Sequence, residues 1–236
     1  MFDHQPIHSN SKNQISFYRF ESKEVWISET LKFFNKTIQD KISIHSQSEI
    51  HIILSGGNTP LPIYRRLSTL ELPWQQMHFW LADERCVSKT DSFRSEQEIK
   101  KALGDSILSR AFFHSLPEGD PDFVANYFEE QIKNISNFTI SFLGIGEDGH
   151  IASLFPNFEI GENDFSPNVL SVYHSPKPPA NRVSLSLNCL NRSEHVVFLV
   201  NGSNKMKIVD QVMSGEELPA TKVKGRKSSQ IFFCME

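Results

Sequence analysis

The stretch EIHIILSGGNTP, residues 49–60, contains the pattern that decides the fold. Its apolar run from Ile50 to Leu54 is short and almost continuous, which is typical of a buried strand. Two glycines follow and allow a sharp turn, and Thr59 and Pro60 suit the cap and the first position of a helix. The stretch therefore predicts a strand, a tight turn and a helix in immediate succession.

The same succession continues along the chain. We expect strands at QISFYRF (14–20), EIHIILSGG (49–57), MHFWLADER (77–85), FTISFLGIG (138–146), VLSVYH (169–174), RVSLSL (182–187), HVVFLVNG (195–202) and SQIFFCM (229–235). We expect helices over residues 22–42, 60–70, 96–108, 123–135 and 203–215. Strands that alternate with helices predict an α/β fold, with a mostly parallel Rossmann-like sheet, helices on both faces and a few additional short strands.

The length and composition of the chain fit one globular domain. Hydrophobic residues make up 39% of its 236 residues and charged residues 22%, which is the composition of an ordinary soluble protein with a buried core. We expect residues 1–13 to form a loose polar extension and residues 14–236 to form a single domain. The formal net charge of −4 argues against a surface that is basic throughout, as for nucleic acid, but allows a small basic pocket.

The sequence carries no signal for a membrane or for export. No apolar run approaches the ~20 residues that a membrane helix needs, and the polar residues 1–14 lack the apolar segment of a secretory signal. Cys86, Cys189 and Cys234 are scattered, which favours reduced thiols over disulfides or a zinc site. We therefore expect a cytoplasmic monomer without a nucleic-acid or membrane partner.

Three polar stretches follow predicted strands, where ligands bind in open α/β sheets. In the first, SGGNTP (residues 55–60), the backbone N–H groups of Gly56, Gly57, Asn58 and Thr59 favour a phosphate group. An ordinary turn between a strand and a helix uses the same residue types. The stretch matches neither GxGxxG nor a Walker loop, so it does not indicate a nucleotide.

Charged residues define the second stretch, DERCV (residues 83–87). Asp83 and Arg85, at a strand end, can orient a partner group and hold an anion. Arg182 ends a proline-rich loop, and Lys205 lies in the first turn of a predicted helix, where a cation opposes the helix dipole and an anionic partner becomes favourable. For all four, a charge at the solvated surface is the alternative.

The third stretch, LGIGEDGHIASLFP (residues 143–156), presents Asp148-Gly149-His150 after a strand. The pKa of histidine suits proton transfer near neutral pH, so His150 is a candidate catalytic group. A histidine that caps a helix would fit the position equally well. No HxxxH pair or Cys/His cluster accompanies His150, which disfavours a metal site, and no GxSxG elbow supports a serine-hydrolase triad.

Taken together, these stretches resemble the 6-phosphogluconolactonase family, within the larger group that includes glucosamine-6-phosphate deaminases. SGGNTP, WLADERCV, LGIGEDGHIASLFP, SPKPPANRVSLSLNCLN and VFLVNGSNK resemble segments of that family in the same order, from about Ile50 to Ala220. The chain departs from the family pattern at Phe93, where asparagine is common, at Ile151, where threonine is common, and at Asn157, where glycine is usual. The departures leave the motif residues Asp83, Arg85 and His150 intact.

The resemblance implies hydrolysis of 6-phospho-D-glucono-1,5-lactone to 6-phospho-D-gluconate, the second step of the oxidative pentose phosphate pathway. It implies His150 as the base that activates water, Asp83 as the group that orients the imidazole or the water, and Arg85 as a charge that offsets the developing oxyanion. The 6-phosphate is expected at residues 56–59, Arg182 and Lys205. No cofactor or metal is expected, because a lactone is already activated.

Two competing functions remain open from the sequence. An aldose–ketose deaminase of the sister branch would continue its signature with a glutamate where this chain has Phe155, and it tends to have tyrosine where this chain has Arg85. Both differences favour the lactonase. A sugar-phosphate binding protein without catalysis is the alternative from a different class, and the intact Asp83, Arg85 and His150 argue against it.

Overall fold

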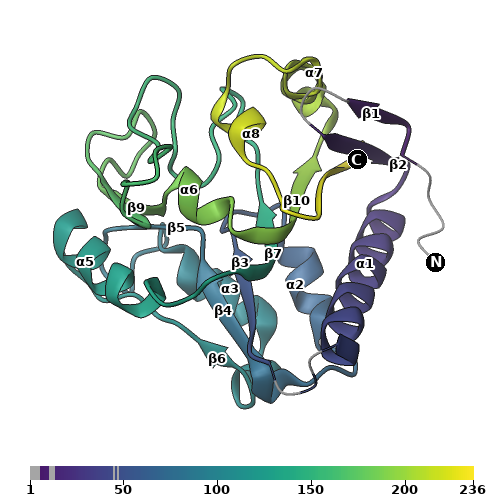
Figure 1. Ribbon diagram of the computed structural model, residues 1–236, viewed down its shortest axis with the longest axis horizontal. Helices are drawn as coiled ribbons and strands as arrows, with labels where there is room; N and C mark the ends of the chain where they lie inside the picture. Colours follow the sequence, from purple (N-terminus) through teal and green to yellow (C-terminus); the bar gives the residue numbers. More distant parts are fainter. Residues whose placement is uncertain (1–5, 11–13, 45, 47) are drawn as a thin grey trace.

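In the part of the chain that the structure describes, eight strands form one sheet, in the order β1-β2-β11-β10-β7-β3-β4-β6 (Figure 1). The computed structural model describes residues 6–10, 14–44, 46 and 48–236. Every neighbouring pair in the sheet is parallel except β1 with β2. The strands are β1 (His8–Asn10), β2 (Ile15–Phe20), β3 (Ile50–Leu54), β4 (Met77–Leu81), β6 (Phe112–Phe113), β7 (Phe138–Leu143), β10 (Ser193–Asn201) and β11 (Ser228–Cys234).

Helices cover both faces of this sheet, as the sequence predicts. Figure 1 shows α1 on one side of the sheet and α5 on the other. All six residues of β7, in the middle of the sheet, are buried, because a parallel strand with both faces covered has no solvent-exposed side. The helices are α1 (Lys23–Ile44), α2 (Leu61–Leu67), α3 (Ser95–Leu103), α4 (Asp105–Leu108), α5 (Pro121–Ile132), α6 (Leu187–Leu190), α7 (Met206–Ser214) and α8 (Pro219–Lys222), with 3-10 turns η1 (Trp74–Gln76) and η2 (Ser203–Lys205).

The strand order reverses between β3 and β7. From β3 the chain moves outward to β4 and β6, and it then returns to the other side of β3 to form β7, β10 and β11. Such a reversal opens a crevice outside the carboxyl ends of the two strands, which is where ligands bind in open α/β sheets. The stretches that follow β3 and β7 are SGGNTP and the turn that contains His150.

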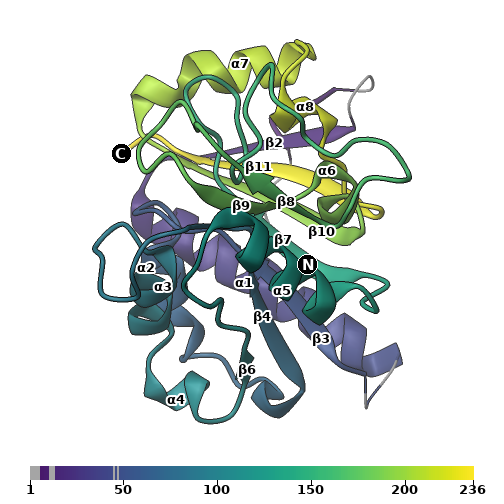
Figure 2. The same ribbon diagram turned by 90° about the vertical axis from the view of Figure 1, so that its left-hand side faces the viewer.

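A second, three-stranded antiparallel sheet has the order β5-β9-β8. It consists of β5 (Asp83–Arg85), β8 (Val169–Val172) and β9 (Arg182–Leu185), and β8 and β9 are the additional short strands that the sequence predicts. Figure 2 shows β8 and β9 alongside the large sheet.

The sequence predicts MHFWLADER as one strand, but the chain divides it between the two sheets. Ala82, fully buried, is the joint between β4 and β5. Its N–H donates to the carbonyl of Leu54 in the large sheet (2.9 Å), and its carbonyl accepts from the N–H of Leu185 in the small sheet (2.9 Å). Asp83 and Arg85 therefore belong to the small sheet, although their strand begins in the large one.

Three further details differ from the expectations. Pro60 occupies the N-cap position of α2, which begins at Leu61, and no side chain caps this helix, so the expected cap by Thr59 is wrong. The helix expected over residues 96–108 is divided into α3 and α4 at Gly104, which adopts a φ of +72°. Within residues 1–13, expected to be loose, residues 8–10 pair with β2, whereas residues 1–5 and 11–13 lie outside the described part of the chain.

Three histidines gather near the amino ends of β3 and β4, at the edge of the sheet opposite to the crevice. Trp80 donates its Nε1–H to Nδ1 of His51 (3.1 Å), and Nδ1 of His78 lies 2.9 Å from Nε2 of His114. Burial, and then the neighbouring His78, lower the pKa of both His51 and His114 to about 4. Across the described part of the chain, no helix combines the length and the apolar character needed to span a membrane.

Candidate active site

A cavity of about 340 Å³ lies at the carboxyl edge of β3, β4 and β7. It brings together most of the site residues predicted from the sequence: Gly56, Gly57, Asp83, Arg85, His150, Arg182 and Lys205. Asn58 and Thr59 follow in the same turn but are not among the residues that line the cavity. Four of the lining side chains are cationic, namely Arg85, Lys177, Arg182 and Lys205, so the cavity suits an anionic ligand.

His150 is paired with Asp148, two residues earlier in the same turn. The imidazole Nδ1 makes a short hydrogen bond with Oδ1 of Asp148. An ionised carboxylate only accepts hydrogen bonds, so Nδ1 carries the hydrogen and Nε2 carries the lone pair. Because His150 lines the cavity, its Nε2 can accept a proton from a molecule bound there.

Glycine is required at position 146 for this pair to form. A Cβ atom there would lie 2.0 Å from Nδ1 of His150 and 2.8 Å from Oδ1 of Asp148. The turn is closed by two main-chain hydrogen bonds, from Gly146 to the carbonyl of His150 (2.9 Å) and from Gly149, whose φ is +80°, to the carbonyl of Gly146 (3.0 Å). The glycines of the motif therefore make room for the imidazole and hold it after the buried β7.

The environment keeps His150 neutral near pH 7. Burial lowers the pKa of His150 below its usual value, and the hydrogen bond and charge of Asp148 oppose that shift without cancelling it. For Asp148, burial alone would raise the pKa, but the hydrogen bonds and charge of His150 outweigh it and lower the pKa. A neutral imidazole beside an ionised carboxylate is the combination that a general base requires.

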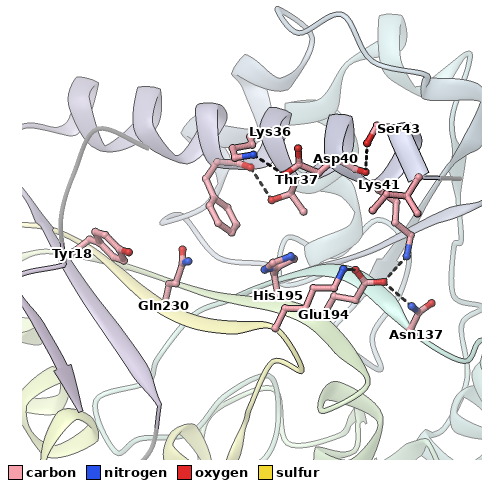
Figure 3. A pocket seen from close by; sticks show the side chains of 13 residues that line it. Tyr18, Lys36, Thr37, Asp40, Lys41, Ser43, Asn137, Glu194, His195 and Gln230 are labelled. Carbon is pink, nitrogen blue, oxygen red and sulfur yellow. Dashed lines mark hydrogen bonds and ion pairs between the residues drawn. The ribbon is translucent and has the colours of Figure 1, made fainter. Parts of the chain in front are cut away.

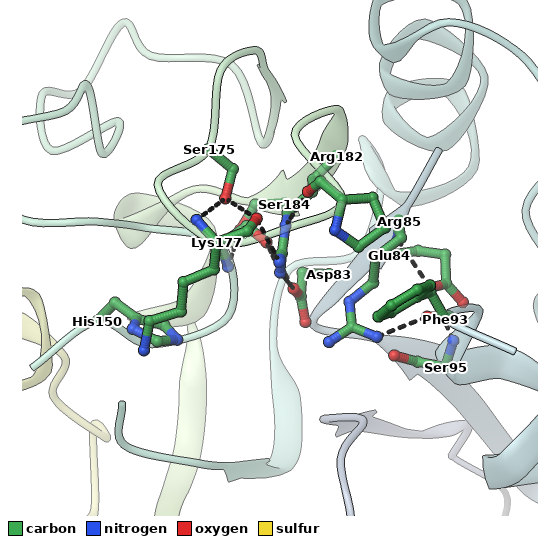
Figure 4. Close-up of polar contacts among 12 residues, drawn as sticks. Asp83, Glu84, Arg85, Phe93, Ser95, His150, Ser175, Lys177, Arg182 and Ser184 are labelled. Atoms are coloured by element: carbon green, nitrogen blue, oxygen red, sulfur yellow. Dashed lines mark hydrogen bonds and ion pairs between the residues drawn. The ribbon is translucent and has the colours of Figure 1, made fainter. Parts of the chain in front are cut away.

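Asp83 does not contact the imidazole. Its Oδ2 accepts a hydrogen bond from the Ser153 hydroxyl (2.6 Å) and lies 3.9 Å from Nη1 of Arg182. Its carboxylate is nearly buried and faces the cavity between His150 and Arg85 (Figure 4). Asp148, rather than Asp83, therefore orients the imidazole.

Arg182 lines the cavity, but most of its donors bind the neighbouring loop. Nη2 donates to the carbonyls of Lys177 (3.0 Å) and Pro178 (3.1 Å), and Nε donates to the carbonyl of Pro179 (3.0 Å). The side chain is 4% exposed, and burial lowers its pKa although the charge of Asp83 opposes this. Arg182 thus holds the loop that carries Lys177 over the cavity.

The two lysines of the cavity each face a carboxylate of the turn at residues 146–150, called the catalytic turn below. Nζ of Lys177 lies 3.8 Å from Oδ1 of Asp148, and Nζ of Lys205 lies 3.6 Å from Oε1 of Glu147. Both distances exceed that of a hydrogen bond, so both ammonium groups keep donors for a ligand.

Phe155 is fully buried beneath the catalytic turn. Its ring lies 4.7 Å from the imidazole of His150, centroid to centroid. The guanidinium of Arg182 lies 5.8 Å from the same ring. An apolar side chain therefore occupies the position at which the deaminase signature has glutamate.

The sequence analysis did not assign roles to Asp148, Ser153 or Lys177. Asp148 and Ser153 belong to the motif already singled out, and Lys177 belongs to the proline-rich loop that ends at Arg182. A carboxylate two residues before a candidate base is a signal that could have identified Asp148. The contacts of Ser153 and Lys177 depend on how β9 and its loop fold back, which no local pattern indicates.

A larger cavity, of about 730 Å³, lies between α1 and the strands β2, β10 and β11 (Figure 3). Its lysines are paired, Lys36 with Asp40, and both Lys41 and Lys227 with Glu194. Because these charges already satisfy one another, the larger cavity is a poorer anion site than the smaller one. Within residues 6–10, 14–44, 46 and 48–236, no three His, Cys, Asp or Glu side chains are grouped to hold a metal ion.

Comparisons with known proteins identify the family of the chain. A 6-phosphogluconolactonase of Thermotoga maritima is 31% identical over 207 residues, which cover 84% of this chain and 89% of that protein. A 6-phosphogluconolactonase of Mycobacterium leprae is 31% identical over 212 residues, covering 83% of this chain and 85% of that protein. A crystal structure of the Thermotoga maritima 6-phosphogluconolactonase superposes with a TM-score of 0.82 at 27% identity, over 93% of this chain and 99% of that one. Residues 21–232 match the model of the glucosamine-6-phosphate isomerases/6-phosphogluconolactonase family, and the chain therefore belongs to that family.

Proposed function

We propose that this chain hydrolyses 6-phospho-D-glucono-1,5-lactone to 6-phospho-D-gluconate. The observation that carries the proposal is the neutral His150, oriented by Asp148, at a cavity lined by four cationic side chains. The substrate needs both features, because it carries a phosphate and an ester carbonyl that water must attack.

The phosphate is bound by two of the cationic side chains of the cavity and by the turn that follows β3. Lys205 and the backbone N–H groups of Gly56 and Gly57, which line the cavity, hold it, and Arg182 adds its positive charge. Gly56 brings this turn close to α3, since a Cβ at position 56 would lie 2.2 Å from the hydroxyl oxygen of Ser95.

His150 is the general base. A water molecule attacks C1 of the lactone while Nε2 of His150 takes one of its protons. The C1–O5 bond then breaks, and the imidazolium returns the proton to the ring oxygen, which becomes the 5-hydroxyl. Asp148 stabilises the imidazolium between these two steps, as a carboxylate on Nδ1 does in a catalytic triad.

Negative charge develops on the carbonyl oxygen in the transition state, and a nearby cation stabilises it. Arg85 offsets this charge, and Lys177, beside Asp148, is a second cation within the same cavity. Asp83 lies between His150 and Arg85 and orients the attacking water.

Turnover of two substrates tests the proposal. The purified protein is incubated with freshly prepared 6-phosphogluconolactone and, separately, with glucosamine 6-phosphate, and the uncatalysed hydrolysis of the lactone is subtracted. We expect accelerated lactone hydrolysis and no ammonia. Ammonia release would indicate the deaminase, and binding of either sugar phosphate without turnover would indicate a binding protein.

A further inference from the structure

Arg85 is held by a main-chain carbonyl. Its Nη1 donates to the carbonyl oxygen of Phe93 at 2.5 Å, while the Phe93 ring is 50% exposed beside it (Figure 4). Nε of Arg85 is buried and has no hydrogen-bond partner among the described residues. The bond to Phe93 thus fixes one corner of the guanidinium.

The segment that carries the Phe93 carbonyl is in turn held by Arg94, the next residue. Arg94 is 2% exposed, and its Nη1 donates to the carbonyl of Val87 (3.1 Å). Its Nη2 donates to the carbonyls of Leu116 and Pro117 and lies 3.3 Å from the carboxylate of Glu96. One guanidinium therefore ties both ends of the segment 87–94 to the chain at residues 116–117.

Glu84 fixes the main chain on the other side of Arg85. Its carboxylate is 1% exposed and accepts from the N–H groups of Arg85 (2.7 Å), Ser95 (2.9 Å) and Glu96 (2.7 Å). The backbone of Arg85 and the start of α3 are therefore held by one carboxylate. The remaining freedom of the Arg85 side chain depends on where the Phe93 carbonyl lies.

We propose that Arg94 is a positioning residue for Arg85, acting through the carbonyl of Phe93. Arg94 keeps the segment 87–94 in place, the carbonyl keeps the guanidinium of Arg85 turned toward the cavity, and catalysis depends on that orientation. The inference rests on the proposed function, in which Arg85 meets the substrate. It also accounts for Phe93 at a position where the family pattern has asparagine, since a main-chain carbonyl makes the contact whatever side chain is present.

A double-mutant cycle tests this role. The variants are Arg85→Gln, Arg94→Gln and the combination, and the control is Arg192→Gln. Arg192 donates to the carbonyl of Ile135 (2.8 Å) and to Sγ of Cys189 (3.0 Å), and it is not among the residues that line the cavity. Each variant is checked for folding by circular dichroism, and kcat and KM for the lactone are measured.

We expect Arg94→Gln to lower kcat/KM about tenfold, with the same division between kcat and KM as Arg85→Gln. We expect the double variant to be no worse than Arg85→Gln alone, because a positioning residue has no effect once its target is gone. Arg192→Gln should keep the wild-type kinetics. If Arg94→Gln does not fold, the cycle is repeated with Arg94→Lys, which keeps the charge but loses the fork of donors.

Two outcomes would overturn the inference, and they differ. Multiplicative losses in the double variant, or an Arg94→Gln variant as active as Arg192→Gln, would show that Arg94 only stabilises the fold. An Arg85→Gln variant with wild-type kinetics would instead remove Arg85 from the proposed mechanism, and the positioning role would fall with it.

Discussion

The ring of Phe155 packs against the imidazole of His150, with 4.7 Å between centroids and 37° between planes. The contact closes the underside of the catalytic turn with apolar surface. A carboxylate in place of this ring would be buried next to His150, with the guanidinium of Arg182, 5.8 Å from the ring, as a charge that could compensate it.

We expect Phe155→Glu to lower the free energy of unfolding by several kcal/mol and not to gain deaminase activity. Loss of the packed ring alone should lower the free energy of unfolding by about 3–5 kcal/mol. Burial of the carboxylate adds a further cost. Urea unfolding measures the stability, with Phe155→Leu as the apolar control. Wild-type protein, free of host deaminase, that makes fructose 6-phosphate and ammonia from glucosamine 6-phosphate would refute the assignment to the lactonase branch.

His150→Ala should fold normally and lose about 10²–10⁴-fold in kcat, because loss of a general base has an effect of this size. The side chain is mostly buried, but its hydrogen-bond partner Asp148 is 39% exposed and can be solvated after the change. Circular dichroism and steady-state kinetics are the measurements. A folded variant with nearly wild-type kcat at neutral pH would exclude His150 as the base.

The pH dependence of kcat/KM should report His150. The base acts only when neutral, and burial holds its pKa below the ordinary value of 6.5, so activity should fall on the acid side of that value. In Asp148→Asn, the charge that raises the pKa of His150 is gone, so the acid limb should move to lower pH while the maximum rate falls. An acid limb that stays in place or moves to higher pH would contradict the pairing of these two residues.

Lys205→Ala should raise KM about tenfold with little change in kcat, because a contact to a phosphate that does not react binds the ground state and the transition state alike. Lys207→Ala, which changes an exposed lysine in the first turn of α7, is the matched control. A loss in kcat at unchanged KM would place Lys205 at the reacting carbon.

Arg182→Ala should behave differently from Lys205→Ala, because it leaves the carbonyls of residues 177–179 without their side-chain donor and removes the cation that lies 3.9 Å from the buried Asp83. We expect a loss of about 2–4 kcal/mol in the free energy of unfolding together with a lower kcat. Urea unfolding and kinetics on the same preparation measure both. Wild-type stability with raised KM alone would show that Arg182 is a simple phosphate ligand.

The histidines at the opposite edge of the sheet should make the fold sensitive to acid. The pKa of His51 and of His114 is about 4 in the folded chain and near 6.5 in the unfolded chain, so between these values the unfolded chain binds more protons. Stability should be complete above pH 6.5 and decline as the pH falls toward 4, by up to about 1.4 kcal/mol per pH unit for each histidine.

Urea unfolding at pH 7.5 and pH 5 measures this decline. The double variant His51→Gln/His114→Gln should show a smaller decline than wild type, and His174→Gln, an exposed histidine, should not. An unchanged difference between the two pH values in the double variant would exclude the cluster as the source.

Periodicity and turn residues predicted most of the fold, because the central strands are continuous apolar runs that end at glycine. They could not predict that Leu81 and Asp83 belong to different sheets, since Ala82 looks like any buried strand residue and its two hydrogen bonds are tertiary. The two-residue β6 could not be predicted from the sequence either, because it is defined by its pairing with β4 rather than by a pattern of its own.

The positions of His150 and Lys205 at the cavity could be predicted from residue type and place in the sequence, whereas their roles stay predictions. The prediction of the site was incomplete where a side chain acts through its neighbours. Arg182 was expected to hold the phosphate, but its position beside the carbonyls of residues 177–179 arises from the fold of its own loop. The contact between Asp148 and His150 could have been predicted more easily than those of Arg182, since both residues lie in one short turn.

The joint at Ala82 limits how this enzyme can vary in length. One residue links Leu81, whose position the large sheet sets, to Asp83, whose position the small sheet sets. An insertion or deletion of a single residue there would shift Asp83 and Arg85 out of register with His150 and turn their side chains to the opposite side of the strand. Loops that neither line the cavity nor hold its residues can change in length without that penalty, so natural or engineered length variation is compatible with catalysis there but not at this joint.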